Sequence, residues 1–280
     1  MQTYPSPVEL HRFALAQRGA GRRIVLVPTM GALHDGHLEL VRAARRHGDT
    51  VIASIFVNPA QFGPSEDFAR YPRDPAGDSA KLATAGCDAL FLPTPDSIYP
   101  PGFDTYVVPT ALADVLCGAS RPGHFRGVCT VVALLFRMSA CHAAVFGEKD
   151  FQQLQIIRRM NTDLWLGVDI VGHAIVRDAD GLALSSRNAY LSHDERHAAL
   201  ALPRALAEVR RAFAAGERSP AHLAELARQT LAATDSLRID YAAVVSPESL
   251  RPPTEASHGD LCALAAYAGK TRLIDNARLG

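Results

Sequence analysis

Two histidines, His34 and His37, stand three residues apart in the stretch TMGALHDGH, directly after the apolar run RIVLVP. Gly31 and Gly36 allow tight backbone turns, and a helix that begins after such a turn favours a bound anion at its first residues. A histidine there can donate hydrogen bonds to phosphate oxygens. We rank a phosphate site first, a structural role for both histidines second, and a metal site third, because no clear third ligand lies nearby in sequence.

A second candidate cluster is VFGEKDFQQLQ, residues 145–155, where a glycine is followed by a lysine and polar residues at a predicted helix start. Lys149 is a mobile point charge that suits a polyphosphate. Gln153 lies one helical turn further on, so both side chains can face one pocket. The alternative is an ordinary helix start, in which Glu148 and Asp150 complement the helix dipole and Lys149 is solvated.

A third cluster is DGLALSSRNAYLS, residues 180–192. Ser185 and Ser186 supply hydroxyl groups and Arg187 supplies a guanidinium fork, and these groups suit a phosphate tail. An ordinary polar loop with Asn188 in a turn is the alternative.

Neutral amides form a fourth cluster in SIFVNPAQF, where Asn58 and Gln61 follow an apolar run and suit a small polar substrate. Turn chemistry around Asn58 and Pro59 would explain the same pattern. The stretch RPGHFRGV adds Arg121, His124 and Arg126 before a predicted helix, or forms a simple surface loop.

The elements that must position these clusters alternate between strand and helix. We expect strands at RIVLVPT, TVIASIFV, DALFLPT and HAAVFG, and helices at HLELVRAARRHG, DSAKLATAGC, GVCTVVALLFRMS and FQQLQIIRRMNTDL. Such alternation predicts a Rossmann-like, doubly wound parallel sheet with right-handed crossovers. In sheets of this kind ligands bind beyond the carboxyl ends of the strands, where the clusters lie.

The pattern of alternating strands and helices changes after VDIVGHAIVR. We expect two alanine-rich helices, over 192–216 and 219–234, followed by short strands in IDYAAVVSP, LCALAAYAG and TRLIDNA. This pattern predicts a first domain over residues 1–177 and a smaller α+β domain over 178–280, so that the whole chain is of the α/β class.

Composition excludes several classes of function. The 280 residues carry 29 basic and 29 acidic side chains, so no overall field recruits nucleic acid or a membrane surface. The longest apolar runs are too short to span a bilayer, and the first residues lack the features of a secretory signal. The five cysteines are scattered without a CxxC pair, and reduced thiols in a cytoplasmic protein are the simplest interpretation.

Seven stretches together resemble the pantothenate synthetase family: VPTMGALHDGH, SIFVNPAQF, RYPRD, RPGHFRGV, FGEKDFQQL, DGLALSSRN and TRLIDN. They follow the family's order and span most of the chain. The HxGH pattern alone is shared with class I aminoacyl-tRNA synthetases and cytidylyltransferases, but the combination is far more specific. One departure is SACH, residues 139–142, where the family more often has a proline and an aspartate; it lies at a strand entrance away from the motifs.

The resemblance implies a two-step ligase that uses ATP and Mg²⁺. Pantoate attacks the α-phosphate of ATP to give pantoyl adenylate and pyrophosphate, and β-alanine then attacks the activated carbonyl to give pantothenate and AMP. It also implies a Rossmann-like domain with a smaller C-terminal domain closing over it, usually in a homodimer.

The resemblance further implies roles for individual residues. His34, His37 and Lys149 are the expected catalytic residues, with His37 as proton donor. The residues expected to bind ATP are Met30, Gly31, Ala32, Leu33, His34, Asp35, Gly36, His37, Gly147, Glu148, Lys149, Asp150, Val176, Leu184, Ser185, Ser186 and Arg187. Gln61 and Gln153 are expected to bind pantoate, and Gln61 with Asn58 to bind β-alanine. Asp78 is a secondary candidate for a magnesium or β-alanine contact.

Three rival functions agree less well with the sequence. A class I aminoacyl-tRNA synthetase is disfavoured because the chain is short and has no basic bias for tRNA. A non-catalytic nucleotide-binding module would explain the glycine turns but not the convergence of Lys149, Arg187 and two histidines. A nicotinamide-dependent oxidoreductase is disfavoured because no G-x-G-x-x-G follows the first predicted strand.

Overall fold

Six parallel strands form the larger of two sheets in the computed structural model, which describes residues 1–64 and 66–280. Their order across the sheet is β1-β4-β3-β2-β5-β6. Their bounds are β1 (Gln2–Tyr4), β2 (Ile24–Thr29), β3 (Thr50–Ile55), β4 (Ala89–Phe91), β5 (Ala143–Gly147) and β6 (Asp169–His173). Every residue of β3 is buried, as its β-rich sequence without charged residues predicts for a strand covered on both faces. The predicted doubly wound parallel sheet is confirmed.

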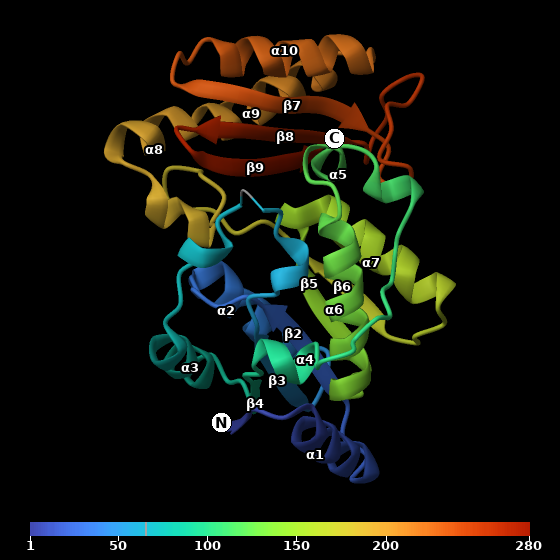
Figure 1. The fold of residues 1–280 in the computed structure, drawn as a ribbon. Helices are drawn as coiled ribbons and strands as arrows, with labels where there is room; N and C mark the ends of the chain where they lie inside the picture. Colours follow the sequence, from blue (N-terminus) through green and yellow to red (C-terminus); the bar gives the residue numbers. More distant parts are fainter. Residues whose placement is uncertain (65) are drawn as a thin grey trace.

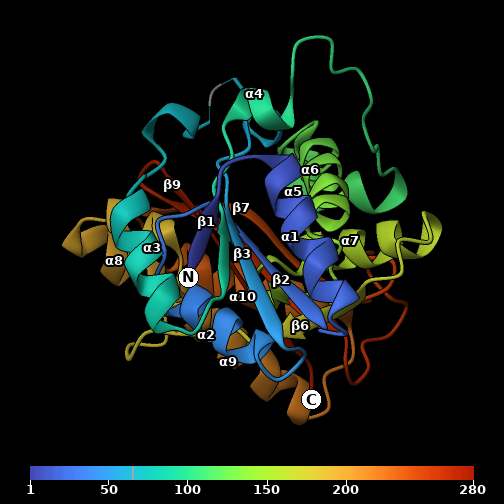
Figure 2. The same ribbon diagram turned by 90° about the horizontal axis from the view of Figure 1, so that it is seen from below.

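Helices cover both faces of this sheet (Figure 2). One face packs against α1 (Pro7–Gly19), α6 (His124–Ser139) and α7 (Phe151–Asp163). The other face packs against α2 (Asp35–Ala44) and α3 (Pro75–Thr84). The short helices α4 (Pro95–Ile98) and α5 (Cys117–Ser120) lie in the long connection between β4 and α6. Across the described residues no helix is both long and apolar enough to cross a membrane.

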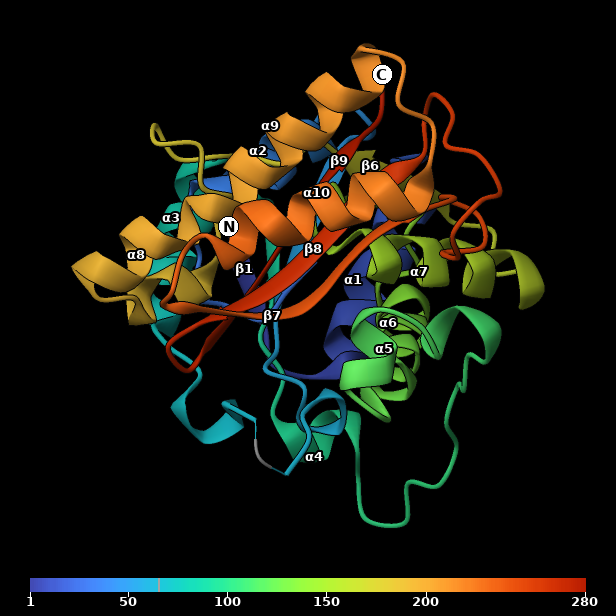
Figure 3. The ribbon, with the colours of Figure 1, turned by 90° about the horizontal axis from the view of Figure 1, so that it is seen from above.

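A smaller antiparallel sheet follows, in the order β7 (Leu237–Val245), β8 (Leu261–Ala268), β9 (Thr271–Arg278). Two helices, α9 (Ala201–Ala214) and α10 (Pro220–Ala232), cover one of its faces and enclose a separate apolar core (Figure 3). The expected smaller α+β unit is therefore present. Its sheet lies over one end of the parallel sheet, and β9 is the strand nearest to that end (Figure 1).

Two differences from the sequence-based expectation have clear physical reasons. The expected helix over 192–216 is divided into α8 (His193–Ala199) and α9, because Pro203 has no N–H to continue the ladder and is tolerated only in a first turn. The strands β1 and β6 and the helix α1 were not predicted at all. The signal for α1 was in the sequence, since Ser6 precedes Pro7 at the first helical position.

Residues 139–142, where the sequence departs from the family pattern, lie where they were expected. They precede β5, at the opposite end of that strand from Gly147. His142 Nδ1 accepts a 2.9 Å hydrogen bond from the backbone N–H of Ile24, and the backbone N–H of His142 donates a 2.9 Å hydrogen bond to the Ile24 carbonyl. The histidine thus ties β5 to β2.

Candidate active site

Residues 29–37 connect the carboxyl end of β2 to α2 and bring the two histidines together. The ring centroids of His34 and His37 lie 4.0 Å apart, and His37 Nδ1 accepts a 3.4 Å hydrogen bond from the backbone N–H of His34. Both rings sit at the start of α2, where backbone N–H groups and the helix dipole favour negative charge. Within the described part of the chain, the buried His34 Nδ1 has no hydrogen-bond partner, so it can donate to or accept from a ligand.

The backbone of this connection is held in a strained shape by Asp78. Ala32 has φ +50°, a left-handed conformation that costs a non-glycine residue about 1–2 kcal/mol. Asp78, whose side chain is 1% exposed, accepts 2.8 Å hydrogen bonds from the N–H groups of Ala32 and Leu33. Both carboxylate oxygens are therefore committed to the loop. This geometry does not fit the expected contact of Asp78 with magnesium or β-alanine, and Asp78 supports the histidine loop instead.

Both histidines are neutral at pH 7. Burial, together with the nearby Lys149 ammonium, lowers the pKa of His34 to about 4. Burial and the neighbouring His34 and Lys149 hold the pKa of His37 well below its usual value. Each imidazole therefore offers one N–H donor and one acceptor nitrogen rather than a full positive charge.

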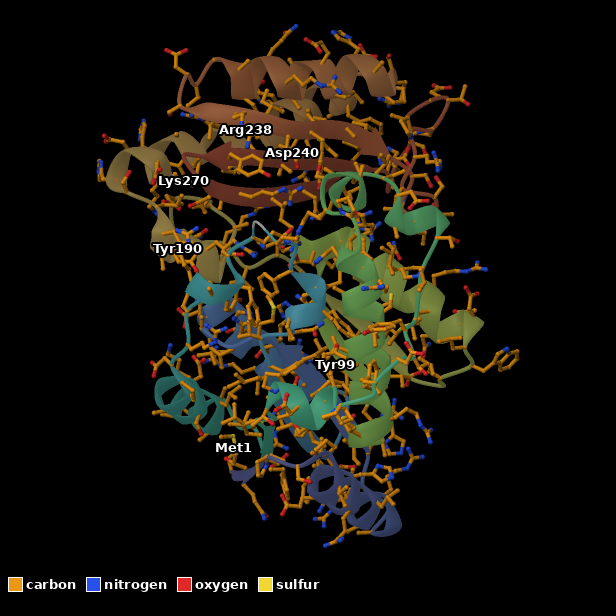
Figure 4. The ribbon with its side chains drawn as sticks, in the orientation of Figure 1. Met1, Tyr99, Tyr190, Arg238, Asp240 and Lys270 are labelled. Atoms are coloured by element: carbon orange, nitrogen blue, oxygen red, sulfur yellow. The ribbon has the colours of Figure 1, made fainter. Side chains whose placement is uncertain are left out.

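Asn58 and Gln61 lie just beyond the end of β3, and their side-chain amides are hydrogen-bonded to each other. The Asn58 amide donates 3.1 Å hydrogen bonds to Gln61 Oε1 and to the Gly127 carbonyl. Its Oδ1 accepts from the N–H of Ala60 (3.2 Å) and from the hydroxyl of Tyr99 (2.8 Å), which Figure 4 labels. All four positions of this amide are used. Asn58 therefore helps to orient Gln61, and its expected contact with β-alanine stays a prediction.

Helix α6 fixes the same turn from the other side. His124 Nδ1 donates a 2.8 Å hydrogen bond to the Gln61 carbonyl, and a Cβ at Gly127 would lie 2.2 Å from the Ala60 carbonyl oxygen. A glycine is thus required where α6 passes the turn. Gln61 Nε2 in turn lies 3.0 Å from the sulfur of Met30, in the histidine loop. The stretch RPGHFRGV therefore positions the glutamine.

Lys149 lies in a single 3-10 turn, Glu148–Asp150, between β5 and α7. Its side chain is 20% exposed, and Nζ lies 3.7 Å from Asp150 Oδ2. Gln153 is on the first turn of α7 and shares a cavity with Lys149, as the spacing predicted.

Residues 185–187 approach from the segment between β6 and α8. Arg187 donates two 3.0 Å hydrogen bonds, from Nε and Nη2, to the two carboxylate oxygens of Asp67. Ser186 Oγ lies 2.9 Å from the hydroxyl of Tyr71. Sequence reasoning found the serines and the arginine but missed these partners. The stretch RYPRD marks the region of Tyr71, but nothing in it identifies Ser186 as the residue it meets.

These segments meet around one cavity of about 220 Å³. The expected site residues that line it are Met30, His34, Gly36, His37, Asn58, Gln61, Gly147, Lys149, Asp150, Gln153, Val176, Leu184, Ser185, Ser186 and Arg187. Those that do not are Gly31, Ala32, Leu33, Asp35, Asp78 and Glu148. An apolar wall from α6, which sequence reasoning missed, is formed by Val128, Val131, Val132 and Leu135. Its signal was the apolar run VVALLF.

A second cavity of about 290 Å³ borders the first and reaches the antiparallel sheet. The two share Lys149, Asp150, Gln153, Ser185 and Arg187. The phosphate-type groups therefore lie at the junction of the parallel sheet and the smaller unit. Figure 4 labels Tyr190 and Lys270, which line this second cavity from the segment before α8 and from the β8–β9 turn.

The chemistry of the first cavity is that of a site for a phosphate-bearing ligand beside a small polar one. A lysine, an arginine, two serines and a helix start can hold phosphate oxygens, and neutral imidazoles and amides can donate to charge that develops nearby. The fold and this site define a Rossmann-like α/β protein with a nucleotide-type pocket at the carboxyl ends of its parallel strands.

Within that class the chain belongs to the pantoate–β-alanine ligase family, whose family model matches residues 2–278. It is 56% identical to the pantothenate synthetase of Anaeromyxobacter dehalogenans over 271 residues, which cover 94% of this chain and 93% of that protein. It is 50% identical to the pantothenate synthetase of Geobacter sulfurreducens over 280 residues, covering 100% and 99% of the two chains.

Solved structures agree with this assignment. The crystal structure of pantothenate synthetase from Thermus thermophilus matches with a TM-score of 0.94 and 45% identity, and covers 99% of both chains. The pantoate–β-alanine ligase of Francisella tularensis, complexed with β-γ ATP and β-alanine, matches with a TM-score of 0.82 and 32% identity, covering 99% and 97%. The chain is therefore a pantothenate-forming ligase.

Proposed function

We propose that this ligase works through an enzyme-bound pantoyl adenylate. A pantoate carboxylate oxygen bonds to the α-phosphorus of ATP, and the bond to the bridging oxygen of pyrophosphate breaks. The amine of β-alanine then attacks the acyl carbon, AMP leaves, and the amine loses a proton. The supporting observation is the meeting of Lys149, Ser185, Ser186 and Arg187 with Gln61 and Gln153 around one cavity.

In the first step the histidines and Lys149 stabilise charge. The neutral His34 and His37 donate hydrogen bonds to the α-phosphate oxygens as that phosphorus becomes five-coordinate. Because the pKa of His37 is held well below its usual value, His37 acts here as a hydrogen-bond donor rather than as the expected proton donor. Lys149 and Arg187 neutralise the departing β- and γ-phosphates, with the Ser185 and Ser186 hydroxyls beside them. Positioning and electrostatics of this kind supply most of what adenylyl transfer requires from a protein.

The remaining pocket residues hold the other groups. Gln61 and Gln153 bind the hydroxyls and carboxylate of pantoate, and Gln61 then meets β-alanine. Gly147, Val176 and Leu184 line the nucleotide. The backbone of Gly31, Ala32, Leu33 and Asp35 shapes the histidine loop around ATP without lining the cavity, and Glu148 does the same for the Lys149 turn.

Mg²⁺ is proposed as the metal that accompanies ATP. Among the described residues no group of three or more His, Cys, Asp or Glu side chains could hold a metal by itself. The donor set still fits Mg²⁺, which is commonly bound through one or two carboxylates and substrate phosphates. Asp150, half-exposed at the rim shared by the two cavities, is the carboxylate that would hold it. The metal would supply neutralisation of phosphate charge.

We also propose two domains, 1–177 and 178–280, with the second acting as a lid over the nucleotide. Each has its own sheet and its own apolar core, which supports the division. A homodimer in the cytoplasm is proposed as well. The five cysteines are free, buried thiols in the described part of the chain, which fits a reducing compartment.

The proposal is tested by exchange of labelled pyrophosphate into ATP. We expect exchange that requires pantoate and Mg²⁺ but no β-alanine, because the adenylate forms before the amine is used. Lys149→Ala should abolish the exchange, and Lys270→Ala, which removes a lysine from the neighbouring cavity, serves as the matched control. Exchange driven by an amino acid with tRNA would favour the synthetase alternative. The absence of any exchange by the folded protein would refute the proposal.

A further inference from the structure

The Lys149 turn is held by a side chain from the other sheet. Asn276, on β9, directs its amide nitrogen at two successive carbonyl oxygens, those of Glu148 and Lys149, each at 3.0 Å. Asn276 is buried, so water does not compete for these hydrogen bonds. The two hydrogens of one amide match two neighbouring carbonyls, and they fix the backbone from which the Lys149 side chain departs.

Asp275, the residue before Asn276, supports the segment that leads to Ser185, Ser186 and Arg187. Asp275 is buried and receives a bidentate ion pair from Arg177, with Nη1 and Nη2 at 2.7 and 2.9 Å from its two oxygens. Arg177 also donates a 3.0 Å hydrogen bond to the carbonyl of Gly181. This pins the turn that runs into Ser185–Arg187. Two adjacent residues of β9 therefore anchor both segments that meet the triphosphate in the proposed function.

The stretch TRLIDN contributes to the family resemblance, but the sequence alone gives it no role. Its last two residues do more than tie the sheets together. Asn276 donates directly to the backbone of the Lys149 turn, and Asp275 holds Arg177, which donates to the Gly181 carbonyl. An error of about 1 Å in placing a charged group can reduce a rate by roughly 10²-fold. The hydrogen bonds of Asn276 limit such an error at Lys149.

We propose that Asn276 is a positioning residue for adenylate formation, acting through the backbone of the Lys149 turn. This inference rests on the proposed function, in which Lys149 stabilises the leaving pyrophosphate. That charge exists in the first step and is absent from the second, since the β- and γ-phosphates have left. The loss of Asn276 should therefore slow adenylate formation and leave the attack of β-alanine unaffected.

The test compares Asn276→Ala with Asn161→Ala. The Asn161 amide also makes two backbone hydrogen bonds, of 3.0 and 3.1 Å to Val168, at the far end of α7. Single-turnover rates are measured for both steps, the second with preformed pantoyl adenylate. We expect Asn276→Ala to reduce the first rate by roughly 10- to 100-fold and to leave the second unchanged. Asn161→Ala should change neither rate beyond what its stability loss explains.

A second measurement keeps the inference separate from the proposed function. Amide hydrogen exchange in the segment 147–153 should become faster in Asn276→Ala and stay unchanged in Asn161→Ala. Unchanged exchange there would overturn the inference whatever the enzyme's chemistry. Faster exchange with equal losses in both steps would also overturn it, because Asn276 would then support the whole pocket. If the wild type forms no adenylate, the proposed function is refuted. Amide hydrogen exchange in the segment 147–153 still tests whether Asn276 holds the Lys149 turn. Asn276→Ser, whose hydroxyl cannot span two carbonyls, replaces the alanine variant if that one does not fold.

Discussion

Replacing Asp78 by asparagine tests how the histidine loop keeps its strained shape. The variant has nearly the same volume, but its amide can accept from only one of the two N–H groups that the carboxylate satisfies. A hydrogen bond to a charged partner is worth about 1.5–3 kcal/mol, and a buried N–H left unpaired costs about 1–3 kcal/mol. One N–H is left unpaired and the other keeps only a neutral hydrogen bond, worth about 0.5–1.5 kcal/mol, so we expect the free energy of unfolding to fall by about 2–4 kcal/mol.

The rate of adenylate formation should fall as well, by roughly 10²-fold, because His34 and His37 follow the backbone that Asp78 holds. Part of this loss should be recovered by Ala32→Gly. Glycine adopts the φ of +50° without the penalty that alanine bears, so the loop needs less support. In a double-mutant cycle, Ala32→Gly should raise the free energy of unfolding and the rate of adenylate formation more in the Asp78→Asn background than in the wild type.

The assays are urea unfolding and single-turnover adenylate formation, each for all four proteins of the cycle and the latter over a series of Mg²⁺ concentrations. We expect a stability loss and a rate loss that magnesium does not reverse. If stability were unchanged and excess Mg²⁺ restored the rate, Asp78 would be a metal contact, and our assignment of it to the loop would be refuted.

Three further predictions concern the pocket and its charges. His37→Ala should slow adenylate formation by roughly 10² to 10³, the usual cost of losing one transition-state donor, with little change in the urea midpoint; activity dependent on added zinc would instead support the metal alternative. Asp67→Asn frees the Arg187 fork for phosphate and should lower the KM for ATP by up to roughly 5-fold, since a partly exposed pair is worth up to about 1 kcal/mol; a higher KM would mean that Asp67 orients Arg187. Burial, more than the neighbouring cations, lowers the pKa of His34 and of His124 to about 4 in the folded protein. In the unfolded chain the pKa of a histidine is near 6.5, so between pH 6.5 and pH 4 the unfolded chain binds more protons than the folded protein. Urea titrations should therefore show stability decreasing as the pH is lowered across that window, by about 1.4 kcal/mol per unit for each histidine, and His124→Gln should flatten the slope.

Most strands and the longer helices were predictable because their signals are local, whereas β1, β6 and α1 were not predicted. β3 is mostly apolar and rich in β-branched residues, and the periodic helices α7 and α10 stand within two residues of where their sequence patterns place them. The helix α3 begins and ends three residues earlier than the predicted stretch 78–87, because Asp74 caps it and Pro75 occupies its first position. The site segments were predictable for a related reason, since glycines and polar residues directly after a buried strand indicate ligand-binding loops in an α/β sheet. The break between α8 and α9 was not predicted, because the expected helix over 192–216 ran through Pro203.

The contacts that hold the site segments were not predictable. Asp67 and Arg187 are 120 residues apart, and Asn276 is 127 residues from Lys149. A single sequence gives the types of these residues but not which of them meet. Asn58 illustrates the same point, because the sequence shows an amide suited to a substrate but not the four hydrogen bonds that this amide makes within the protein.

The hydrogen bonds between β9 and the Lys149 turn also bear on how the protein is made. A ribosome completes the Lys149 turn 127 residues before it reaches Asn276. At about 5–20 residues per second, this interval lasts about 6–25 s. During that time the parallel sheet can form from its own strands, while the turn lacks the amide that fixes its carbonyls. A growing chain would therefore form its larger sheet before the Lys149 turn is fixed, so that efficient adenylate formation would begin only once β9 has been made.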